Sequence, residues 1–268
     1  MLNTEKRNPK TTHIDKMTTI EMLQIITEEN YNAVKAVEEE TIHIAEAIEA
    51  ITETLENGGR LFYIGAGTSG RLAVVDAAEC PPTFGVPGDL VTGIIAGGSA
   101  CMMQASENAE DNEENGVRDI LDRGIKKGDV LVGISAAGGA AYVLGAMKKA
   151  KEIGCTTIAL TCNKGSLMDQ FGDISICTDT GAEVITGSTR MEAGTAQKLV
   201  LNMLSTCAMI KTGKVYENLM INLQPTNIKL RKRVISIVME LLDCDSDKAV
   251  ELLDEKNWDI RSVVEANK

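Results

Sequence analysis

A glycine-rich loop with two hydroxyl groups follows the apolar run near residue 60 and could bind a phosphate. The loop reads GAGTSG (residues 65–70), and its hydroxyls belong to Thr68 and Ser69. Backbone N–H groups at the start of a helix favour a dianion, and neighbouring hydroxyls add neutral donors. We therefore predict a phosphate site at Gly67, Thr68, Ser69 and Gly70. The alternative is a tight strand-to-helix turn that holds no ligand.

The spacing of this loop also fits the dinucleotide-binding fingerprint G-x-G-x-x-G, so the two kinds of ligand must be told apart. A dinucleotide site needs an acidic residue at the end of the second strand to bind the ribose hydroxyls. Here the second apolar run ends in IIAGG (residues 94–98), which carries no acid. A phosphomonoester therefore fits the loop better than a pyrophosphate.

Two acidic positions could supply a proton donor and a proton acceptor. Glu79 follows the loop by about two and a half helical turns, and Pro81 and Pro82 are expected to end that helix just after it. The negative end of a helix disfavours an ionised carboxylate, which suits Glu79 to act as an acid; a solvent-facing carboxylate is the alternative. A second acidic cluster, SENAEDNEENG (residues 106–116), is typical of a solvated helix face, and composition alone does not select one of its acids.

An α/β fold is expected to position these groups. Short apolar runs alternate with helical patterns, which is typical of a doubly wound parallel sheet with helices on both faces. Glycine-rich loops follow three of the runs, and they should gather at the carboxyl edge of the sheet, where ligands bind. The expected strands are residues 60–64, 90–96, 129–135, 156–161 and 174–178. The expected helices are two within 18–57, then 103–123, 141–153 and 192–211.

The sequence pattern changes after Pro225, from alternating strands and helices to helices alone. Three short helical patterns follow, with polar breaks at residues 245–247 and at Asn257. We predict a main domain over residues 1–225, which includes the N-terminal helices, and a small three-helix domain over residues 226–268.

Composition excludes several classes of function. The chain has 268 residues, a net charge of −12 and a pI near 4.8, so nucleic acid and anionic membranes are poor partners. Seven cysteines without CxxC spacing indicate reduced thiols, and two histidines offer little for a zinc site or a Ser-His-Asp triad. The polar N-terminus and the lack of any long apolar run predict a cytoplasmic protein without a membrane span.

Several long segments resemble those of N-acetylmuramic acid 6-phosphate etherases. They include TEKRNPKT, NGGRLFYIGAGTSGRLAVVDAAECPPTFG, TIALTCN, AEVITGSTRMEAGTAQKLVLNMLST and GKVYENLM, and the resemblance runs from about residue 4 to the C-terminus. It implies a sugar isomerase (SIS) fold, similarity to the glucokinase regulatory protein, a homodimer and no cofactor or metal. It further implies a carbon–oxygen lyase of cell-wall recycling that releases D-lactate from the sugar phosphate and leaves N-acetylglucosamine 6-phosphate.

The resemblance also implies roles for individual residues. Glu79 in AECPP would be the general acid, and Glu110 in AED would be the general base. The phosphate would further contact Ser188 and Thr189 of GSTR, for which a helix N-cap role is the alternative reading. The remaining binding residues expected, on the loop after the third strand, are Ser135 and Gly138.

That third loop departs from the family pattern. Most members read Ala-Ser-Gly-Arg-Thr-Pro-Tyr, whereas residues 136–142 here read AAGGAAY. A lost hydroxyl and a lost guanidinium remove hydrogen bonds of about 0.5 to 3 kcal/mol each, so we expect weaker sugar-phosphate binding and impaired activity.

Two alternative functions remain open. An aldose–ketose isomerase on the same fold also moves a proton next to an open-chain carbonyl, and a non-catalytic sugar-phosphate sensor needs only the binding loops.

For the oligomeric state, we predict a homodimer in which the N-terminal helices and the 192–211 helix bury apolar faces against the partner, near the site. The alternative is that these faces serve the core of a single chain.

Overall fold

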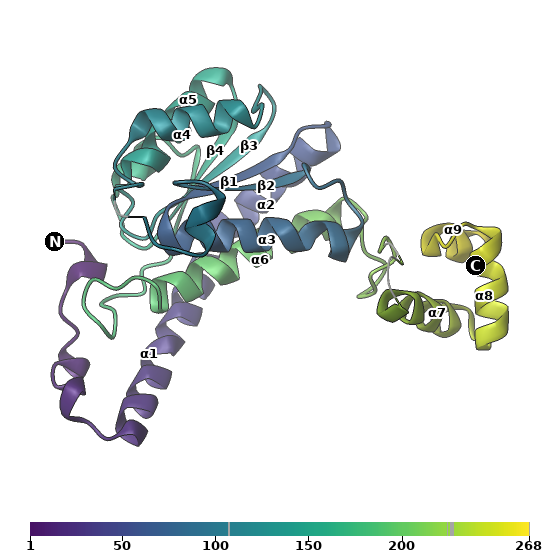
Figure 1. Cartoon of the computed structure of the whole chain (residues 1–268), viewed down its shortest axis with the longest axis horizontal. Helices are drawn as coiled ribbons and strands as arrows, with labels where there is room; N and C mark the ends of the chain where they lie inside the picture. The colour runs from purple at the N-terminus through teal and green to yellow at the C-terminus, as the bar shows by residue number, and fades with distance from the viewer. Residues whose placement is uncertain (107, 224, 226–227, 268) are drawn as a thin grey trace.

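A sheet of five parallel strands forms the centre of the computed structural model, which describes residues 1–106, 108–223, 225 and 228–267. The strand order is β2-β1-β3-β4-β5, so β1 lies between β2 and β3. Figure 1 shows helices on both faces of this sheet. The strands are β1 (Leu61–Gly65), β2 (Val91–Ile95), β3 (Val130–Ile134), β4 (Thr156–Thr161) and β5 (Ile174–Cys177).

The helices form one layer on each face of the sheet and a group at the C-terminus. One face carries α1 (Thr19–Glu39), α2 (Thr41–Glu56), α3 (Gly67–Phe84) and α6 (Glu192–Lys211). The other face carries α4 (Glu113–Asp122) and α5 (Ala141–Ile153). The C-terminal group is α7 (Ile228–Leu242), α8 (Ser246–Glu255) and α9 (Ile260–Asn267). None of the helices in the described residues has both the length and the apolar character needed to cross a bilayer.

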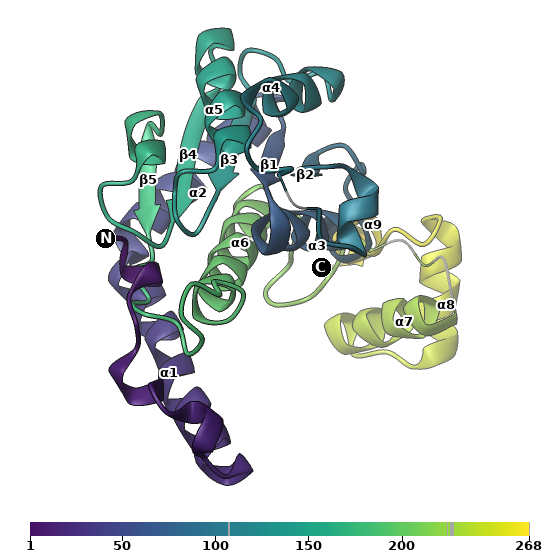
Figure 2. The same cartoon turned by 60° about the vertical axis from the view of Figure 1, so that its left-hand side comes forward.

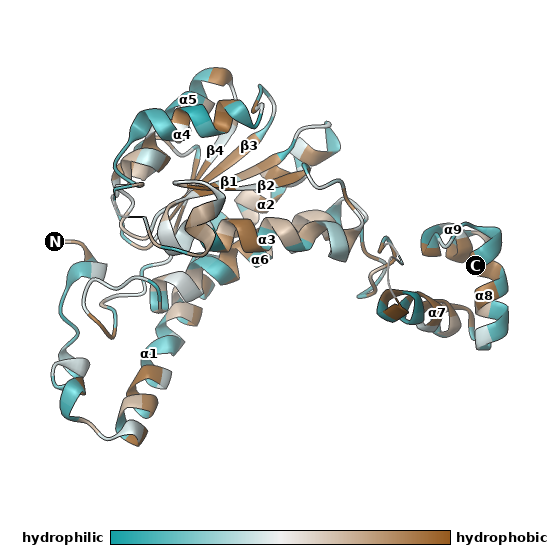
Figure 3. Ribbon diagram, viewed as in Figure 1, coloured by the Kyte–Doolittle hydropathy of each residue, from teal (hydrophilic) through white to brown (hydrophobic). Residues whose placement is uncertain are grey.

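Side chains of the strands alternate between the two layers. In β1, Leu61 and Tyr63 join the apolar cluster of α1, α2, α3 and α6, whereas Phe62 and Ile64 join that of α4 and α5. All four are fully buried, as expected for a strand with a covered face on each side. Figure 3 shows the strands as the most continuous hydrophobic part of the fold.

The expected fold class is confirmed, and one expected helix is wrong in part. The five expected strands, the two helices within 18–57 and the helices 141–153 and 192–211 are all present. The helix expected over 103–123 begins only at Glu113, because the side chain of Asn112 accepts a hydrogen bond from Asn115 N (2.8 Å) and caps it there. The residues before it include Asn108, whose positive φ of 66° is incompatible with a right-handed helix.

The expected end of α3 is also wrong. The helix does not stop after Glu79 but continues through Pro81 and Pro82 to Phe84. The fixed φ of proline is compatible with a helix, and the two missing N–H groups remove only the intrahelical donors for the carbonyls of Ala77 and Ala78. Gly85, with a φ of 64°, ends it by donating its N–H to the Pro81 carbonyl (2.9 Å).

A buried polar contact joins α3 to α6. The Asp76 carboxylate accepts hydrogen bonds from Asn202 Nδ2 (2.6 Å) and Ser205 Oγ (3.2 Å). Burial raises the pKa of Asp76, and these hydrogen bonds oppose that effect. The contact fixes the two helices side by side, so that both N-termini lie at the carboxyl edge of the sheet (Figure 2).

Two glycines let α4 and α5 approach each other closely. A methyl group on Gly116 would collide with the Tyr142 carbonyl, and one on Gly145 would collide with the Glu113 carbonyl. Next to this contact, Tyr142 N donates to the Glu110 carbonyl (2.9 Å). The helix pair therefore holds the backbone of Glu110 in place.

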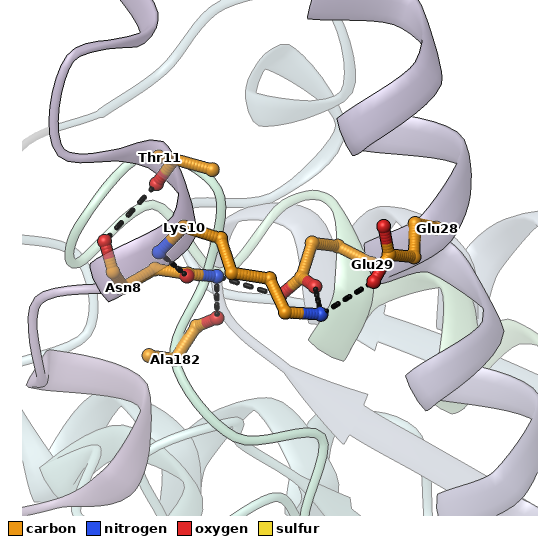
Figure 4. Close-up of polar contacts among 6 residues, drawn as sticks. All are labelled: Asn8, Lys10, Thr11, Glu28, Glu29 and Ala182. Atoms are coloured by element: carbon orange, nitrogen blue, oxygen red, sulfur yellow. Dashed lines mark hydrogen bonds and ion pairs between the residues drawn. The ribbon is translucent and has the colours of Figure 1, made fainter.

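The N-terminal residues form a strap, defined here as residues 3–16, that contains three short 3-10 turns. They are η1 (Asn3–Glu5), η2 (Pro9–Thr11) and η3 (Ile14–Lys16). Figure 4 shows Asn8 donating to Glu29 Oε2 (2.6 Å) and to the Ala182 carbonyl (3.1 Å), and Lys10 paired with two glutamates of α1. The strap thus connects α1 to the loop before α6.

The C-terminal helices pack around an apolar cluster of their own. Their buried side chains include Val234, Leu253 and Val263, and Ile221 and Leu223 of the preceding segment join them. Figure 1 shows this group apart from the sheet. The boundary expected between residues 225 and 226 stays a prediction, and residue 226 lies outside the described residues.

We expect Gly145→Ala to lower the free energy of unfolding by about 1–3 kcal/mol, because its methyl group meets backbone that cannot move aside. Urea unfolding followed by circular dichroism measures this change. Gly88→Ala is the matched control, since a methyl there meets no atom within 4 Å, and its effect should stay within about 0.5 kcal/mol. Equal stability of the two variants would show that α4 and α5 do not require the close approach.

Candidate active site

A cavity of about 280 Å³ lies at the carboxyl ends of β1 and β3. This is the position where the strand order reverses, since the chain runs from β1 to β2 on one side and then to β3 on the other. The walls come from the loops after β1 and β3, the strap, the loop before α6 and the segment before α4. The lining residues are Glu5, Ala66, Gly67, Thr68, Ser69, Glu110, Ile134, Ser135, Ala136, Ala137, Ala140, Gly187 and Thr189.

The first turn of α3 provides neutral hydrogen-bond donors to this cavity. Its N-cap residue, Ala66, has no side chain that could accept a hydrogen bond, and Gly70 makes the first intrahelical bond, to the Ala66 carbonyl (3.2 Å). The backbone N–H groups of residues 67–69 therefore have no acceptor among the described residues. Unpaired N–H groups at a helix N-terminus form an anion site.

Glycines in the same loop allow the helix to start directly from the strand. A methyl on Gly65 would lie 2.8 Å from Gly70 N, and one on Gly70 would lie 2.5 Å from the Gly65 carbonyl oxygen. Gly67 has a φ of 52°, in the left-handed region that side chains disfavour. The glycine spacing thus serves the turn geometry, and Gly70 itself does not line the cavity.

Ser69 lines the cavity and is held from behind by α6. Its Oγ lies 2.9 Å from Oε1 of Gln197, and both side chains are buried. Gln197 Nε2 has no partner among the described residues. If the amide turns over, Nε2 donates to Ser69 Oγ and frees the hydroxyl hydrogen for a ligand. The Ser69 hydroxyl therefore lies beside the free N–H groups, with Gln197 behind it.

The loop after β3 forms the opposite wall. Ser135 lines the cavity, and its carbonyl and Oγ both accept from Gly138 N (3.1 and 3.2 Å). Gly138 has a φ of 70° and does not line the cavity; a methyl on it would collide with Ser166. Ala136, Ala137 and Ala140 present only methyl groups and backbone here. This wall is therefore poorer in polar side chains than the first.

The GSTR loop contributes Thr189 to the cavity, whereas Ser188 does not line it. Neither side chain caps α6, so the N-cap alternative for GSTR is wrong. Glu183 fills that role instead: its Oε2 accepts from Glu192 N (3.1 Å) and its Oε1 from Ala193 N (3.0 Å). A negative charge at a helix N-terminus is favourable.

Glu183 shares its buried position with a second carboxyl group. Glu192 is 1% exposed, and neither of its carboxyl oxygens has a partner among the described residues. Burial, followed by the adjacent Glu192 side chain, raises the pKa of Glu183 to about 8. A protonated carboxyl group in this pair is therefore the stable state near neutral pH.

The two expected catalytic residues occupy different places. Glu110 lines the cavity, and its backbone is held by Tyr142 N. Glu79 is exposed on α3 and does not line the cavity of its own chain. It lies about 18 Å along the helix from Gly67 at 1.5 Å per residue. The single chain thus brings together one of the two carboxylates and the loop after β1.

Sequence reasoning did not select Glu5 as a site residue, yet it lines the cavity with Glu110. A methyl on Gly187 would lie 3.3 Å from Glu5 Oε2, so the carboxylate sits beside the GSTR loop. The segment TEKRNPKT contains Glu5, but no spacing or composition in it pointed to the cavity.

Fold and site together define a sugar isomerase (SIS) domain. The family described as SIS domain matches residues 103–207, and the N-terminal SIS domain of glucokinase regulatory protein matches residues 43–151. Solved phosphoheptose isomerases from Neisseria gonorrhoeae and Francisella tularensis share the fold, each with a TM-score of 0.55, at 23% and 22% identity. They cover 71% and 72% of this chain and 98% of their own chains.

More similar relatives narrow the class to one family. An N-acetylmuramic acid 6-phosphate etherase from Clostridium botulinum is 52% identical over 97% of this chain and 86% of its own length. One from Aliivibrio salmonicida is 51% identical over 96% and 85%, and one from Geobacillus is 46% identical over 98% and 89%. The chain belongs to the N-acetylmuramic acid 6-phosphate etherase family.

The raised pKa of Glu183 predicts that the protein loses stability as the pH rises. An acid with a higher pKa in the folded than in the unfolded chain stabilises the fold below pH 4.5, its ordinary pKa, and loses that contribution as the pH rises through about 8. Urea unfolding at pH 6 and pH 8 should show a fall of at most ~1.4 kcal/mol per pH unit from this group. Glu192→Gln should flatten the fall, because an amide can donate to the ionised Glu183. The control, Glu56→Gln on the exposed side of α2, should leave the slope unchanged; a slope in Glu192→Gln equal to that of the parent would show that the Glu192 side chain does not raise the pKa of Glu183.

Proposed function

We propose that this chain cleaves the lactyl ether of N-acetylmuramic acid 6-phosphate and releases D-lactate and N-acetylglucosamine 6-phosphate. The observation that carries the proposal is the identity of about half of the residues, over nearly the whole chain, with etherases of this name. The cavity supports it, because its neutral donors suit a phosphomonoester and it holds a carboxylate for proton transfer. We place this reaction in the cytoplasm, which agrees with seven unpaired thiols in the described residues.

The chemistry follows from the open-chain form of the sugar. Its C1 aldehyde makes the C2 proton acidic, and the lactyl ether oxygen on C3 is then in the β position. A base removes the C2 proton, the C2–C3 double bond forms, and the C3–O bond breaks as an acid protonates the departing lactate oxygen. Water then adds across the double bond, with its oxygen at C3 and a proton at C2. The overall reaction is an elimination followed by hydration.

In this scheme Glu110 is the base and Glu79 is the acid. The position of Glu110 on the cavity, with its backbone fixed by Tyr142, supports its role. The first turn of α3, with Thr189, would hold the phosphate, and Ser69 would add a donor through its contact with Gln197. The role of Glu79 rests on the family motif AECPP and on the assembly proposed below.

Exchange of the C2 proton with deuterated solvent separates the two roles. We expect Glu110→Gln to lose exchange and D-lactate release by about 100-fold or more, the usual scale for a general base. Glu79→Gln should keep exchange but slow D-lactate release. Proton exchange by NMR and an enzymatic D-lactate assay give the two readouts.

Exchange that survives in Glu110→Gln but not in Glu79→Gln would reverse the two roles. Normal D-lactate release by both variants would exclude a catalytic role for either residue. Binding of the sugar phosphate by the parent protein without release of D-lactate would favour a non-catalytic sensor.

A homodimer explains how Glu79 can take part. α1 extends away from the sheet (Figure 1) and exposes Ile20, Leu23 and Tyr31, which follow a helical stripe, and α6 exposes Met203 and Ile210. These are the helices for which we predict burial against a partner. Exposed apolar stripes of this kind support an interface between copies.

The surface of α3 extends this face. Val75, 53% exposed, lies one helical turn before Glu79 on the same side of α3, and α3 is held against α6. A partner that covers Val75 would also meet Glu79. We therefore propose that the Glu79 carboxylate acts in the cavity of the partner copy, with each site built from two chains.

Subunit complementation tests this assembly. Mixed dimers of Glu79→Gln and Glu110→Gln would contain one site with both substitutions and one with neither, if each site takes Glu79 from the other copy. We expect refolded equimolar mixtures to recover about a quarter of the parent D-lactate release, since half of the dimers are mixed and each has one intact site. Sedimentation velocity verifies the dimer. No recovery from a dimeric mixture would show that Glu79 and Glu110 of one chain act in the same site, and a 28.7 kDa species would exclude the dimer.

Weaker sugar-phosphate binding, caused by the altered loop at 136–141, remains a prediction. Ala137 lines the cavity, where a hydroxyl would reach a ligand, and a side chain on Gly139 would meet no atom within 4 Å. Both positions therefore have space for the polar side chains of the family pattern.

A further inference from the structure

Glu5 is fixed at the cavity by polar contacts of its neighbours in the strap. Asn163 Oδ1 accepts from Asn3 N (2.7 Å), and its Nδ2 donates to Thr4 Oγ1 (3.0 Å) and to the Ala136 carbonyl (2.9 Å). Asn3 Nδ2 also donates to Asp179 Oδ2 (2.7 Å). Thr4 is fully buried, although it is polar and near the end of the chain. One asparagine therefore joins the strap to the wall of the cavity and sets the position of the next residue, Glu5.

The same strap is fixed a second time farther along. Asn8 donates to the Ala182 carbonyl, and Thr11 Oγ1 donates to the Val184 carbonyl (2.8 Å). Asn8 and Thr11 are buried, at 4% and 6% exposure. These contacts follow the loop that carries Gly187 and Thr189. The strap is thus part of the wall of the cavity and not a loosely attached terminus.

The carboxylate of Glu5 has no partner within the described part of the chain. The neighbouring Lys6 ammonium donates to Asn3 Oδ1 (2.7 Å) and not to Glu5. The cavity lining holds Glu110 as its other charged residue among those described and contains no lysine, arginine or histidine. A carboxylate accepts hydrogen bonds only, so Glu5 can pair with hydroxyl or N–H groups of a ligand but repels a phosphate. Its place beside Gly187 puts it next to the side of the cavity where the phosphate is expected.

We propose that Glu5 is a substrate-binding residue that accepts hydrogen bonds from the sugar hydroxyls nearest the phosphate-bearing carbon C6, which are those on C4 and, in the open-chain form, on C5. The inference rests on the proposed function, because it takes the ligand to be a sugar 6-phosphate. Glu5 distinguishes a hydroxylated sugar phosphate from a bare dianion: the hydroxyls compensate the repulsion between the two anionic groups, and an ion without hydroxyls has no such compensation. The N-terminal strap thereby contributes to specificity.

Titration of the full-length protein with two probes tests this assignment. The probes are N-acetylglucosamine 6-phosphate, measured by calorimetry, and inorganic sulfate, a dianion without hydroxyls, measured by NMR. Hydrogen bonds to a charged group are among the stronger ones, so we expect Glu5→Ala to weaken sugar-phosphate binding by about 10-fold or more and Glu5→Gln by less. Sulfate affinity should stay the same or rise in both variants, because a negative charge is removed. Asp15→Asn removes the same charge from an exposed position of the strap outside the cavity and should change neither affinity.

Each outcome decides for or against Glu5. A parallel loss of both affinities, or a lowered melting temperature, would show a structural role and overturn the assignment. Unchanged sugar-phosphate affinity would exclude the contact, and a parent protein that does not bind N-acetylglucosamine 6-phosphate would overturn the inference as a whole. In the D-lactate assay, Glu5→Gln should raise KM more than it lowers kcat. If the parent binds the sugar phosphate through Glu5 but releases no D-lactate, the proposed function fails and the role of Glu5 stands.

Discussion

A phosphate bound in this cavity, as proposed above, would be held without a cationic side chain from the described lining of the same chain, and the arrangement of the site follows from that constraint. The described lining contains two carboxylates, Glu5 and Glu110, and no basic residue. The protein as a whole carries a net charge of −12. The attraction must therefore come from backbone dipoles, which act over short distances and need exact placement. This explains why the start of α3 is so closely defined by Gly65, Gly67 and Gly70.

The same constraint accounts for the way the flanking helices are joined. The N–H groups of α3 face the cavity only if the helix keeps its angle to β1, and α6 provides that support. Asn202 and Ser205 of α6 bind α3 at Asp76, near the middle of that helix. Gln197 of α6 binds it at Ser69, in its first turn. Buried polar contacts of this kind are directional, whereas apolar packing alone would allow the helices to slide. Specific polar contacts thus preserve a geometry that the hydrophobic core does not determine.

The sequence predicted the strands, most helices and several residues that line the cavity, among them Thr68, Ser69 and Ser135, because these follow from local patterns. Apolar runs bounded by glycine define the sheet, and the loop after β1 combines turn glycines with hydroxyls in a short segment. Two local rules failed. Helical patterning in 103–123 did not reveal the cap at Asn112. Pro81 and Pro82 did not stop α3, because the φ that a proline ring fixes is itself helical.

The parts that could not be predicted depend on contacts between distant segments. Glu5 reaches the cavity through Asn163, which lies more than 150 residues later, and no pattern in either segment indicates that contact. The cap of α6 is similar: Glu183 precedes the helix by nine residues, beyond the usual N-cap position, and the nearer Ser188 and Thr189 were the natural candidates. The position of Glu79 outside its own cavity depends on how α3 lies across the sheet and on what covers its exposed face.

The loop between β5 and α6 shows how these distant contacts combine. Its backbone at Ala182 and Val184 accepts hydrogen bonds from the strap, while the side chain of the residue between them, Glu183, caps α6. Three consecutive residues thus join two different elements. The strap and the start of α6 are therefore joined through one short segment, residues 182–184. Glu5 lies in the strap, and Thr189 lies in the loop that leads from this segment to α6. The carboxyl group of Glu183, whose pKa is raised by burial to about 8, therefore lies in the segment that joins the strap to α6.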